Sequence, residues 1–465
     1  MQSEHIFLVM AQRLGIPKGT RDFDSEQISK RNHIINIVKN QFEQFGFQPI
    51  ETPSFENLST LMGKYGTEGD RLIFKILNSG DFLKKVDDVL LQSRNLAAMT
   101  SKISEKALRY DLTVPFARYV VQHQNELIFP FKRFQIQPVW RADRPQKGRF
   151  REFYQCDADA VGSNSLWQDV ELVQLYDAVF SDLKVPVVIK INNRKVLSGL
   201  ADLLEEKDKF PEFIIALDKL DKIGKDGVIS EMKLKGISDA SIRNIEVIFD
   251  TSDSNDEKIS LLEKILIQSE IGKKGLDELR FVLNQLKEIG LRNAELELDI
   301  TLARGLNYYT GSIFEVVAKN VQMGSIGGGG RYDNLTEIFG LKNMSGVGIS
   351  FGLDRIYLVM EELDLFNKVD VPKPKILFIN FGEKEALHSL KVIRNLRSAG
   401  VKAELYPDAG KLKKQMSYAN KRKIPFVAMA GSQEMEQNVF TLKNMKTGEQ
   451  ETVKTNELVA FLNIN

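Results

Sequence analysis

The feature that most constrains the fold is a pair of strand-like runs on either side of one short polar turn. The runs are FKRFQIQPVW (131–140) and RFREFYQCDADAVG (149–162), and the turn between them contains DRPQKG (143–148). Proline and glycine are typical turn residues, and they punctuate strands rather than continue them. Two β-type runs joined in this way predict a long antiparallel hairpin.

Other segments predict a mixture of helices and strands around this hairpin. Residues 27–45 carry apolar side chains near helical spacing and predict an amphipathic helix that ends near Gly46. Residues 81–107 are predicted to be helical, and 109–120 to turn from strand to helix around Pro115. Further predictions are a helix at 167–183, a buried strand at 185–192, strands at 296–301 and 312–320, and a strand followed by a helix at 346–363.

The length and texture of the chain predict more than one domain. It has 465 residues, of which 43% are hydrophobic, so it can bury a core but is too long for one ordinary domain. Residues 195–288 are rich in Lys, Glu, Asp, Leu and Ile at helical periodicity, which predicts an inserted helical domain. The linker-like VPKPK (371–375) precedes alternating β and α segments, which predict a small α/β domain.

Composition excludes several classes of protein. The formal net charge is +1, so any nucleic-acid surface must be local rather than global. The single cysteine, Cys156, excludes a disulfide within the chain and fits a reducing compartment. The four histidines form no zinc-site spacing with it, so we assign no metal ligand. No run has the length and apolar character of a transmembrane segment.

The turn of the hairpin carries a cluster of cations. Guanidinium groups present a planar fork that matches phosphate oxygens. An aromatic ring directly behind them, Phe153, is placed to stack on a base. The alternative is a solvated, charged hairpin with no ligand. The cations are Arg141, Arg144, Lys147, Arg149 and Arg151.

A second group of candidate residues is acidic and polar. Asp157 and Asp159 alternate with Gln155, so the three side chains share one face of the predicted strand. Asp111 and Thr113 belong to the same set. Carboxylates on a buried face are costly unless they are paired, for example with a ligand amine or a metal. The alternative is that they lie on the solvent side of the sheet.

Three further motifs suit a ligand with charged groups. ARGLNYYTG (303–311) and GGGGRYD (327–333) combine a cation, two tyrosines and glycines that permit close backbone approach. GGGGRYD is neither a P-loop nor a Rossmann fingerprint, and the alternative is a flexible hairpin turn. Arg355 at a helix start favours an anion, or is an ordinary surface arginine. The basic helix at 411–423 suits a nucleic-acid backbone, or is a solvated face.

Together and in this order, these segments resemble class II aminoacyl-tRNA synthetases. PIETPSFE (49–56) is similar to motif 1 of that class, VWRADRPQKGRFREFYQ (139–155) to motif 2, and GVGISFGLDRI (346–356) to motif 3. ARGLNYYTG and GGGGRYD resemble the two signatures of the histidine–tRNA ligase family. The resemblance covers roughly residues 10–465, with Asn307 standing where that family usually has aspartate.

This resemblance implies a domain plan and a set of partners. It implies a class II catalytic domain, an antiparallel sheet flanked by helices, in residues 10–194 and 289–368. A helical insertion would occupy 195–288, and an α/β anticodon-binding domain 373–465. The implied ligands are ATP, Mg²⁺, L-histidine and tRNA(His). Motif 1 implies a homodimer, and the family implies a cytoplasmic location without a membrane.

The resemblance also assigns roles at the nucleotide end of the site. Histidine would attack the α-phosphate of ATP to form histidyl-adenylate, and the histidyl group would then move to the 3′ end of the tRNA. Arg141 and Arg304 would be catalytic and bind the α-phosphate from two sides. Arg149 and Arg355 would hold the β- and γ-phosphates, and Phe153 would stack on adenine.

At the amino-acid end, Asp159 and Tyr309 would bond the two imidazole nitrogens, with Tyr308 packed beside them. The resemblance places the remaining histidine-binding residues at Asp111, Leu112, Thr113, Arg141, Gln155 and Arg304. The alternative function is a non-catalytic histidine sensor, or a regulatory subunit of histidine biosynthesis. Such proteins tend to lose the Arg–Tyr–Tyr signature and the anticodon-binding domain, and both sequence patterns are present here.

Overall fold

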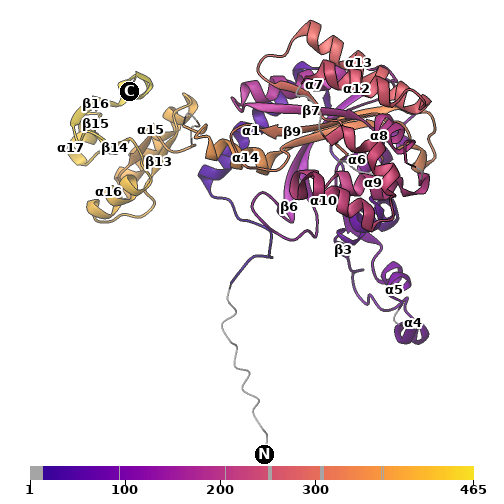
Figure 1. Cartoon of the computed structure of the whole chain (residues 1–465). Coiled ribbons are helices and arrows are strands. Elements are labelled where there is room, and N and C mark those ends of the chain that lie inside the picture. Colours follow the sequence, from indigo (N-terminus) through magenta and orange to yellow (C-terminus); the bar gives the residue numbers. More distant parts are fainter. Residues whose placement is uncertain are drawn as a thin grey trace, which may run out of the picture. The chain divides into compact units, whose positions relative to one another are not determined.

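The computed structural model describes residues 14–93, 95–204, 206–249, 254–303, 308–367, 369 and 371–464 (Figure 1). Contacts divide the chain into two compact units, Met1–Val369 and Asp370–Asn465. Both units mix helices with strands, which confirms the predicted α/β class. Within the described ranges, no helix combines the length and the apolar character needed to cross a membrane.

An eight-stranded sheet forms the centre of the first unit. In spatial order the strands are β1 (Gln48–Pro49), β5 (Phe131–Trp140), β6 (Glu152–Val161), β11 (Gly346–Gly352), β10 (Gly327–Tyr332), β9 (Ser312–Ala318), β7 (Val187–Asn193) and β8 (Glu295–Leu298). In this order all neighbouring pairs from β5 to β7 are antiparallel, and the outermost pairs, β1–β5 and β7–β8, are parallel. β5 and β6 pair from Phe131 opposite Val161 to Trp140 opposite Glu152, which confirms the predicted hairpin.

One face of this sheet is covered by α1 (Ser25–Gln44), α7 (Trp167–Asp182) and α14 (Leu353–Glu362). The predicted helices at 27–45 and 167–183 are therefore confirmed. Cys156 and Ala158 of β6 point into this apolar layer. Because side chains alternate along a strand, the residues between them point to the opposite face, where they can meet a ligand.

The segment before α6 (Thr113–Gln122) differs from the prediction. Residues 81–107 contain two short helices rather than a continuous one, and 109–112 are not a strand. The segment ends in a strand of a small antiparallel sheet, and that pairing overrides the helical tendency of its last residues. The pieces are β2 (Phe55–Asn57), α2 (Leu58–Leu61), α3 (Gly66–Arg71), β3 (Lys75–Ile76), α4 (Asp88–Ser93), α5 (Leu96–Ile103) and β4 (Lys106–Leu108).

Residues 195–288 are helical, as predicted, in the part that the structure describes. Their apolar side chains join the core of the large sheet instead of forming a separate one. Helices α8 and α13 pack closely where Gly199 meets Gly272. A Cβ on Gly199 would lie only 2.5 Å from the Cα of Gly272, so a larger residue would not fit there. The helices are α8 (Arg194–Ala201), α9 (Phe210–Leu217), α10 (Leu220–Leu234), α11 (Asp239–Ile245), α12 (Asn255–Ile265) and α13 (Glu270–Ile289).

The second unit has a five-stranded sheet of its own. β12 pairs in parallel with β13 and β14, and β14, β15 and β16 pair antiparallel, which confirms the predicted alternation of β and α segments. The strands are β13 (Ala403–Leu405), β12 (Ile376–Phe378), β14 (Phe426–Met429), β15 (Val439–Asn444) and β16 (Gln450–Lys454). The helices are α15 (Glu383–Ser398), α16 (Leu412–Lys421), α17 (Ser432–Glu436) and α18 (Leu458–Ile464).

Candidate active site

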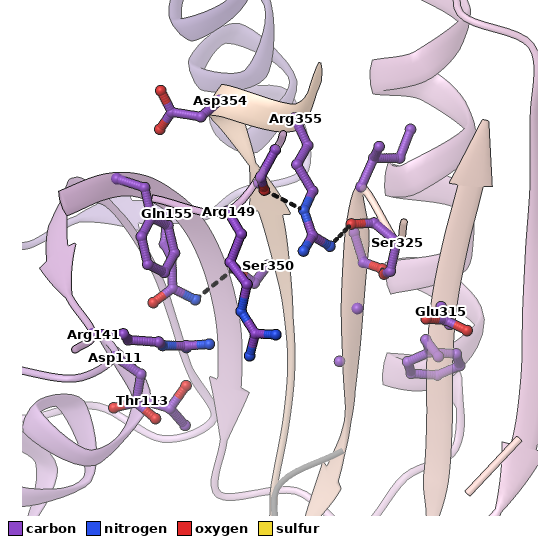
Figure 2. A pocket seen from close by; sticks show the side chains of 18 of the residues that line it. Asp111, Thr113, Arg141, Arg149, Gln155, Glu315, Ser325, Ser350, Asp354 and Arg355 are labelled. Carbon is purple, nitrogen blue, oxygen red and sulfur yellow. Dashed lines mark hydrogen bonds between the residues drawn. The ribbon is translucent and has the colours of Figure 1, made fainter. Parts of the chain in front are cut away.

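A cavity of about 520 Å³ lies over the middle of the large sheet. Its walls come from the β5–β6 hairpin, from β9, β10 and β11, and from the start of α14. Figure 2 shows Arg355, Arg149 and Arg141 following one another down the cavity, with Asp111 and Thr113 beneath Arg141. The hairpin and the helix are far apart in the sequence, so the sheet is what brings these groups together.

Two arginines form the outer part of the cavity. Arg355 enters from the first turn of α14, where its Nε donates to the Gly148 carbonyl at 2.8 Å and its Nη1 to the Ser325 carbonyl at 2.6 Å (Figure 2). Arg149 donates to Asp143 at 2.9 Å, and its side chain is 48% exposed. Guanidinium groups held in this way are suited to bind phosphate oxygens.

Arg141 follows β5 and reaches into the same cavity (Figure 2). Its guanidinium carbon lies 4.3 Å from the ring centroid of Tyr110 and 5.2 Å from that of Phe153. Its Nε also donates to the Tyr110 carbonyl at 3.1 Å. Two aromatic contacts and one hydrogen bond hold the fork in a single orientation. The Phe153 ring lines the cavity itself.

The structure separates the five cations that the sequence placed together. Arg141 and Arg149 line the cavity. Arg144 is exposed, Lys147 forms an ion pair at 3.1 Å with the end of α14, and Arg151 donates to backbone carbonyls. Of these five cations, Arg141 and Arg149 are the two to which the family resemblance assigned phosphate, and their binding of phosphate stays a prediction.

Asp111 is buried beside Arg141 at the inner end of the cavity. Its Oδ1 accepts from the Tyr65 hydroxyl at 2.9 Å and from the Val114 N–H at 3.1 Å, whereas its Oδ2 has no partner. Burial raises the pKa of Asp111, and the hydrogen bonds and the Arg141 cation oppose that rise. An unpartnered buried carboxylate oxygen is a ready acceptor for a ligand amine.

Gln155 of β6 lies next to this group, and its Nε2 donates to Ser350 Oγ at 2.9 Å (Figure 2). Its Oε1 is buried without a partner. Thr113, the first residue of α6, also lines the cavity. The Leu112 side chain is buried and lines neither this cavity nor the recess next to it, and its carbonyl accepts from Arg133.

A recess of about 20 Å³ continues from the cavity and shares Thr113, Tyr309, Gly328 and Ser350 with it. Two carboxyl groups of β6, those of Asp157 and Asp159, line the recess. Each residue is 2% exposed, so the alternative that they face solvent is wrong.

Asp159 already has two strong partners. Its Oδ1 accepts from the Tyr332 hydroxyl at 2.6 Å, and its Oδ2 lies 2.8 Å from Arg133 Nη2. Burial raises the pKa of Asp159, and the Arg133 cation opposes this rise. Gly348 stands opposite Asp159 on β11, and a Cβ there would lie 1.9 Å from the carboxylate, so a side chain at 348 would displace it.

Tyr308 and Tyr309 both line the cavity, with ring centroids 4.9 Å apart. Burial raises the pKa of each phenol, which keeps the hydroxyl groups protonated and able to donate hydrogen bonds. Arg304 and Asn307 lie outside the described residues. The predicted pair of tyrosines is thus placed at the cavity, and the role of Arg304 stays a prediction.

The first six residues of GGGGRYD are strand β10, so the alternative interpretation of the motif as a flexible turn is wrong. The strand is held between β9 and β11, and its glycines give room to neighbours rather than flexibility. A Cβ on Gly330 would lie 2.5 Å from the Ser312 carbonyl and 2.8 Å from the Tyr309 ring. Glycine at 330 therefore lets the Tyr309 ring pack directly against the strand.

Several residues at this site escaped sequence reasoning. Tyr332 lies within GGGGRYD, and nothing in that motif indicates that its hydroxyl donates to Asp159. Arg133 is fully buried in a strand whose apolar neighbours could have indicated a buried cation. Tyr65 gives no such signal, because it meets Asp111 only through the fold. Glu315 lines the cavity from β9 (Figure 2).

An antiparallel sheet with hairpin and helix-start arginines over one cavity defines the catalytic unit of a class II aminoacyl-tRNA synthetase. The family model described as "Histidyl-tRNA synthetase" matches residues 92–356, and the one described as "Anticodon binding domain" matches residues 375–464. The chain belongs to the histidyl-tRNA synthetase family.

Individual relatives agree with this assignment. The "Histidine--tRNA ligase" of Christiangramia forsetii is 65% identical over 97% of this chain and 100% of its own length. That of Flavobacterium johnsoniae is 60% identical over 96% and 98%. The crystal structure of histidyl-tRNA synthetase from Nostoc sp. PCC 7120 has a TM-score of 0.78 and 30% identity, covering 97% of this chain and 99% of that one.

Proposed function

We propose that this chain activates L-histidine with ATP to histidyl-adenylate and transfers the histidyl group to the 3′ end of tRNA(His). The observation that carries the proposal is one cavity lined by three guanidinium groups and continued by a recess with buried carboxyl groups. Phosphate and amino acid would meet between these ends. The relatives named as ligases support the same reaction, and none of them supports a non-catalytic role.

The arginines would act on the nucleotide. Arg141, held between two rings, would bind the α-phosphate and the histidine carboxylate, and Arg304 would bind the same phosphate from the other side. Arg149 and Arg355 would hold the β- and γ-phosphates, and Phe153 would stack on adenine. Negative charge on the phosphate grows as the carboxylate attacks, so guanidinium groups that are already oriented lower the barrier.

The recess would recognise histidine. Asp159 and Tyr309 would bond the imidazole nitrogens, and Tyr308 would pack beside the ring. Asp111 and Gln155 each keep an unpartnered buried oxygen, and these oxygens would accept hydrogen bonds from the α-amino group. A further hydrogen bond would come from Thr113, while Leu112 holds the segment through its backbone. Such a site rejects apolar amino acids, because they leave its polar groups unpaired.

Mg²⁺ would enter with ATP and be held mainly by phosphate oxygens. Among the residues that the structure describes, no three carboxylate, histidine or cysteine side chains gather as a metal site. Glu315 of β9 is one of the carboxylates that line the cavity in which such an ion would lie. The ion would neutralise charge on the leaving pyrophosphate.

We also propose the larger organisation of the protein. Residues 10–194 and 289–368 would be the catalytic domain, 195–288 an insertion that meets the tRNA, and 373–465 the anticodon-binding domain. Motif 1 would form a homodimer, which size-exclusion chromatography with light scattering would detect as twice the mass of 52.8 kDa. The cytoplasm is the proposed location, because tRNA charging accompanies translation.

The test is ATP–pyrophosphate exchange with purified protein and each amino acid in turn. Exchange that depends on histidine alone is the expected result, followed by histidine transfer to tRNA(His) transcripts. Exchange with a different amino acid would contradict the proposed specificity. A folded protein that binds histidine and exchanges with no amino acid would support the regulatory alternative instead.

A further inference from the structure

Asp157 has no part in the roles described so far, although its side chain lies in the recess. It sits on β6 between Gln135 of β5 and Ser350 of β11, on the face that also carries Gln155 and Asp159. It is 2% exposed, and its Oδ1 makes no hydrogen bond. A buried polar atom without a partner is costly, so a fold that keeps one at a cavity has a use for it.

The two carboxyl groups of the recess differ in what they can still bind. Asp159 accepts a hydrogen bond from Tyr332 through Oδ1 and forms an ion pair with Arg133 through Oδ2, although that Oδ2 makes no hydrogen bond. Asp157 has one hydrogen bond, from Ser350, and forms no ion pair with any residue that the structure describes. Burial raises the pKa of Asp157 to about 7, with Arg133 opposing the rise and Asp159 adding to it.

We propose that Asp157 is a specificity-determining residue for histidine, and that its free carboxylate oxygen accepts a hydrogen bond from an imidazole N–H. This inference rests on the proposed function and deepens it. The recess holds roughly one or two water molecules, so the edge of the ring reaches it while the rest lies across the walls shared with the main cavity. Asp157 would share that N–H with Asp159, which lines the same recess, and Tyr309 would meet the other ring nitrogen.

The decisive measurement is histidine-dependent pyrophosphate exchange by Asp157→Asn. The amide keeps the shape of the carboxyl group but replaces an anionic oxygen by a donor. The KM for histidine should rise by about tenfold or more, and the KM for ATP should stay within about twofold. Asp157→Ser, which also removes the carboxylate, should behave in the same way and provides a second variant if the first folds poorly.

Asp177→Asn is the matched control. Asp177 is also a buried carboxylate, 3% exposed, but it accepts hydrogen bonds from the backbone N–H groups of 292–294, away from the cavity. The same isosteric change there should leave the KM for histidine unchanged. Thermal melting of each variant establishes that the exchange assay is carried out on folded protein.

A pH series separates recognition from a structural role. Wild type and Asp157→Asn should differ most in kcat/KM for histidine at pH 8, where Asp157 is ionised, and least at pH 6, where its protonated form resembles the amide. Dividing the kcat/KM of wild type by that of the variant at each pH cancels the titration of free histidine. The groups facing Asp157 that share in its titration are Arg133, Asp159, Asp111, Ser350, Tyr176 and Tyr309.

Failure of the inference can be told apart from failure of the proposed function. If wild type exchanges with histidine and folded Asp157→Asn keeps its KM for histidine within about twofold, Asp157 does not bind the imidazole ring. Equal increases in both KM values, or a ratio of kcat/KM that does not change with pH, overturn it too. Absence of histidine-dependent exchange in the wild type overturns the proposed function itself.

Discussion

Gly348→Ala tests whether the position of Asp159 is set by the sheet. A Cβ at 348 would lie 1.9 Å from Asp159 Oδ1, whereas an ordinary contact begins at 3.4 Å, so the carboxylate must retreat by about the difference of 1.5 Å. That retreat breaks the 2.6 Å bond from Tyr332 and the 2.8 Å pair with Arg133. The displaced carboxylate would also lose its hydrogen bond to the imidazole, and a hydrogen bond to a charged group contributes about 1.5–3 kcal/mol, so the KM for histidine should rise roughly 10- to 150-fold.

The assay is pyrophosphate exchange with histidine and ATP varied separately. Gly352→Ala is the matched control for histidine affinity, because it lies on the same strand and face but its Cβ would stay 3.5 Å from the nearest atom, the Ile326 carbonyl. We expect the control to keep the KM for histidine, and Gly348→Ala to keep that for ATP. An unchanged KM for histidine in folded Gly348→Ala would refute the reasoning, because Asp159 would then not need its present position.

Three further predictions follow from the same site. Arg133→Met should lower the free energy of unfolding by about 3–5 kcal/mol in urea at pH 7, because Asp159 loses its buried cation, and adding Asp159→Asn should recover part of the loss. Arg304→Ala should slow pyrophosphate exchange about a hundredfold or more, and near-normal exchange would contradict its catalytic role. The pKa of Asp157 is raised to about 7 in the folded protein from an unfolded value of about 4. Protonated Asp157 therefore adds to the free energy of unfolding in full below pH 4, and this contribution is lost as the pH rises through 7. At pH 8 the free energy of unfolding of Asp157→Asn should therefore exceed that of wild type by on the order of 2–4 kcal/mol, whereas at pH 4 the two values should be nearly equal. Equal values at pH 8 would argue against a buried carboxyl group with a raised pKa.

Periodicity predicted the main elements where local pattern and tertiary pairing agree. The β5–β6 hairpin has apolar residues on one face and a Pro–Gly turn, so its strands were evident from the sequence. The prediction of a helix over 81–107 was wrong at its end, because β4 pairs there with β2 and β3, which lie earlier in the chain. Strand β10 was not predicted, because four consecutive glycines show no alternation of polar and apolar side chains. Hydrogen bonding to β9 and β11 is what keeps this segment extended.

The sequence by itself determined which chemical groups the site would contain and which family the chain resembles. Motif order placed arginines, tyrosines and carboxylates in segments that the fold then brings to one cavity. Alternation along β6 was enough to give Gln155, Asp157 and Asp159 a common face, because that property depends on neighbouring residues alone.

Only the tertiary structure decided what those groups do to one another. In the fold, Arg133 and Tyr332 contact Asp159, and Asp157 keeps an oxygen without a hydrogen bond. Arg144 is exposed and does not line the cavity. Burial and the distance between charges control these outcomes, and both depend on which strands lie side by side. Strand order is set by contacts between residues far apart in the chain, which no local pattern records.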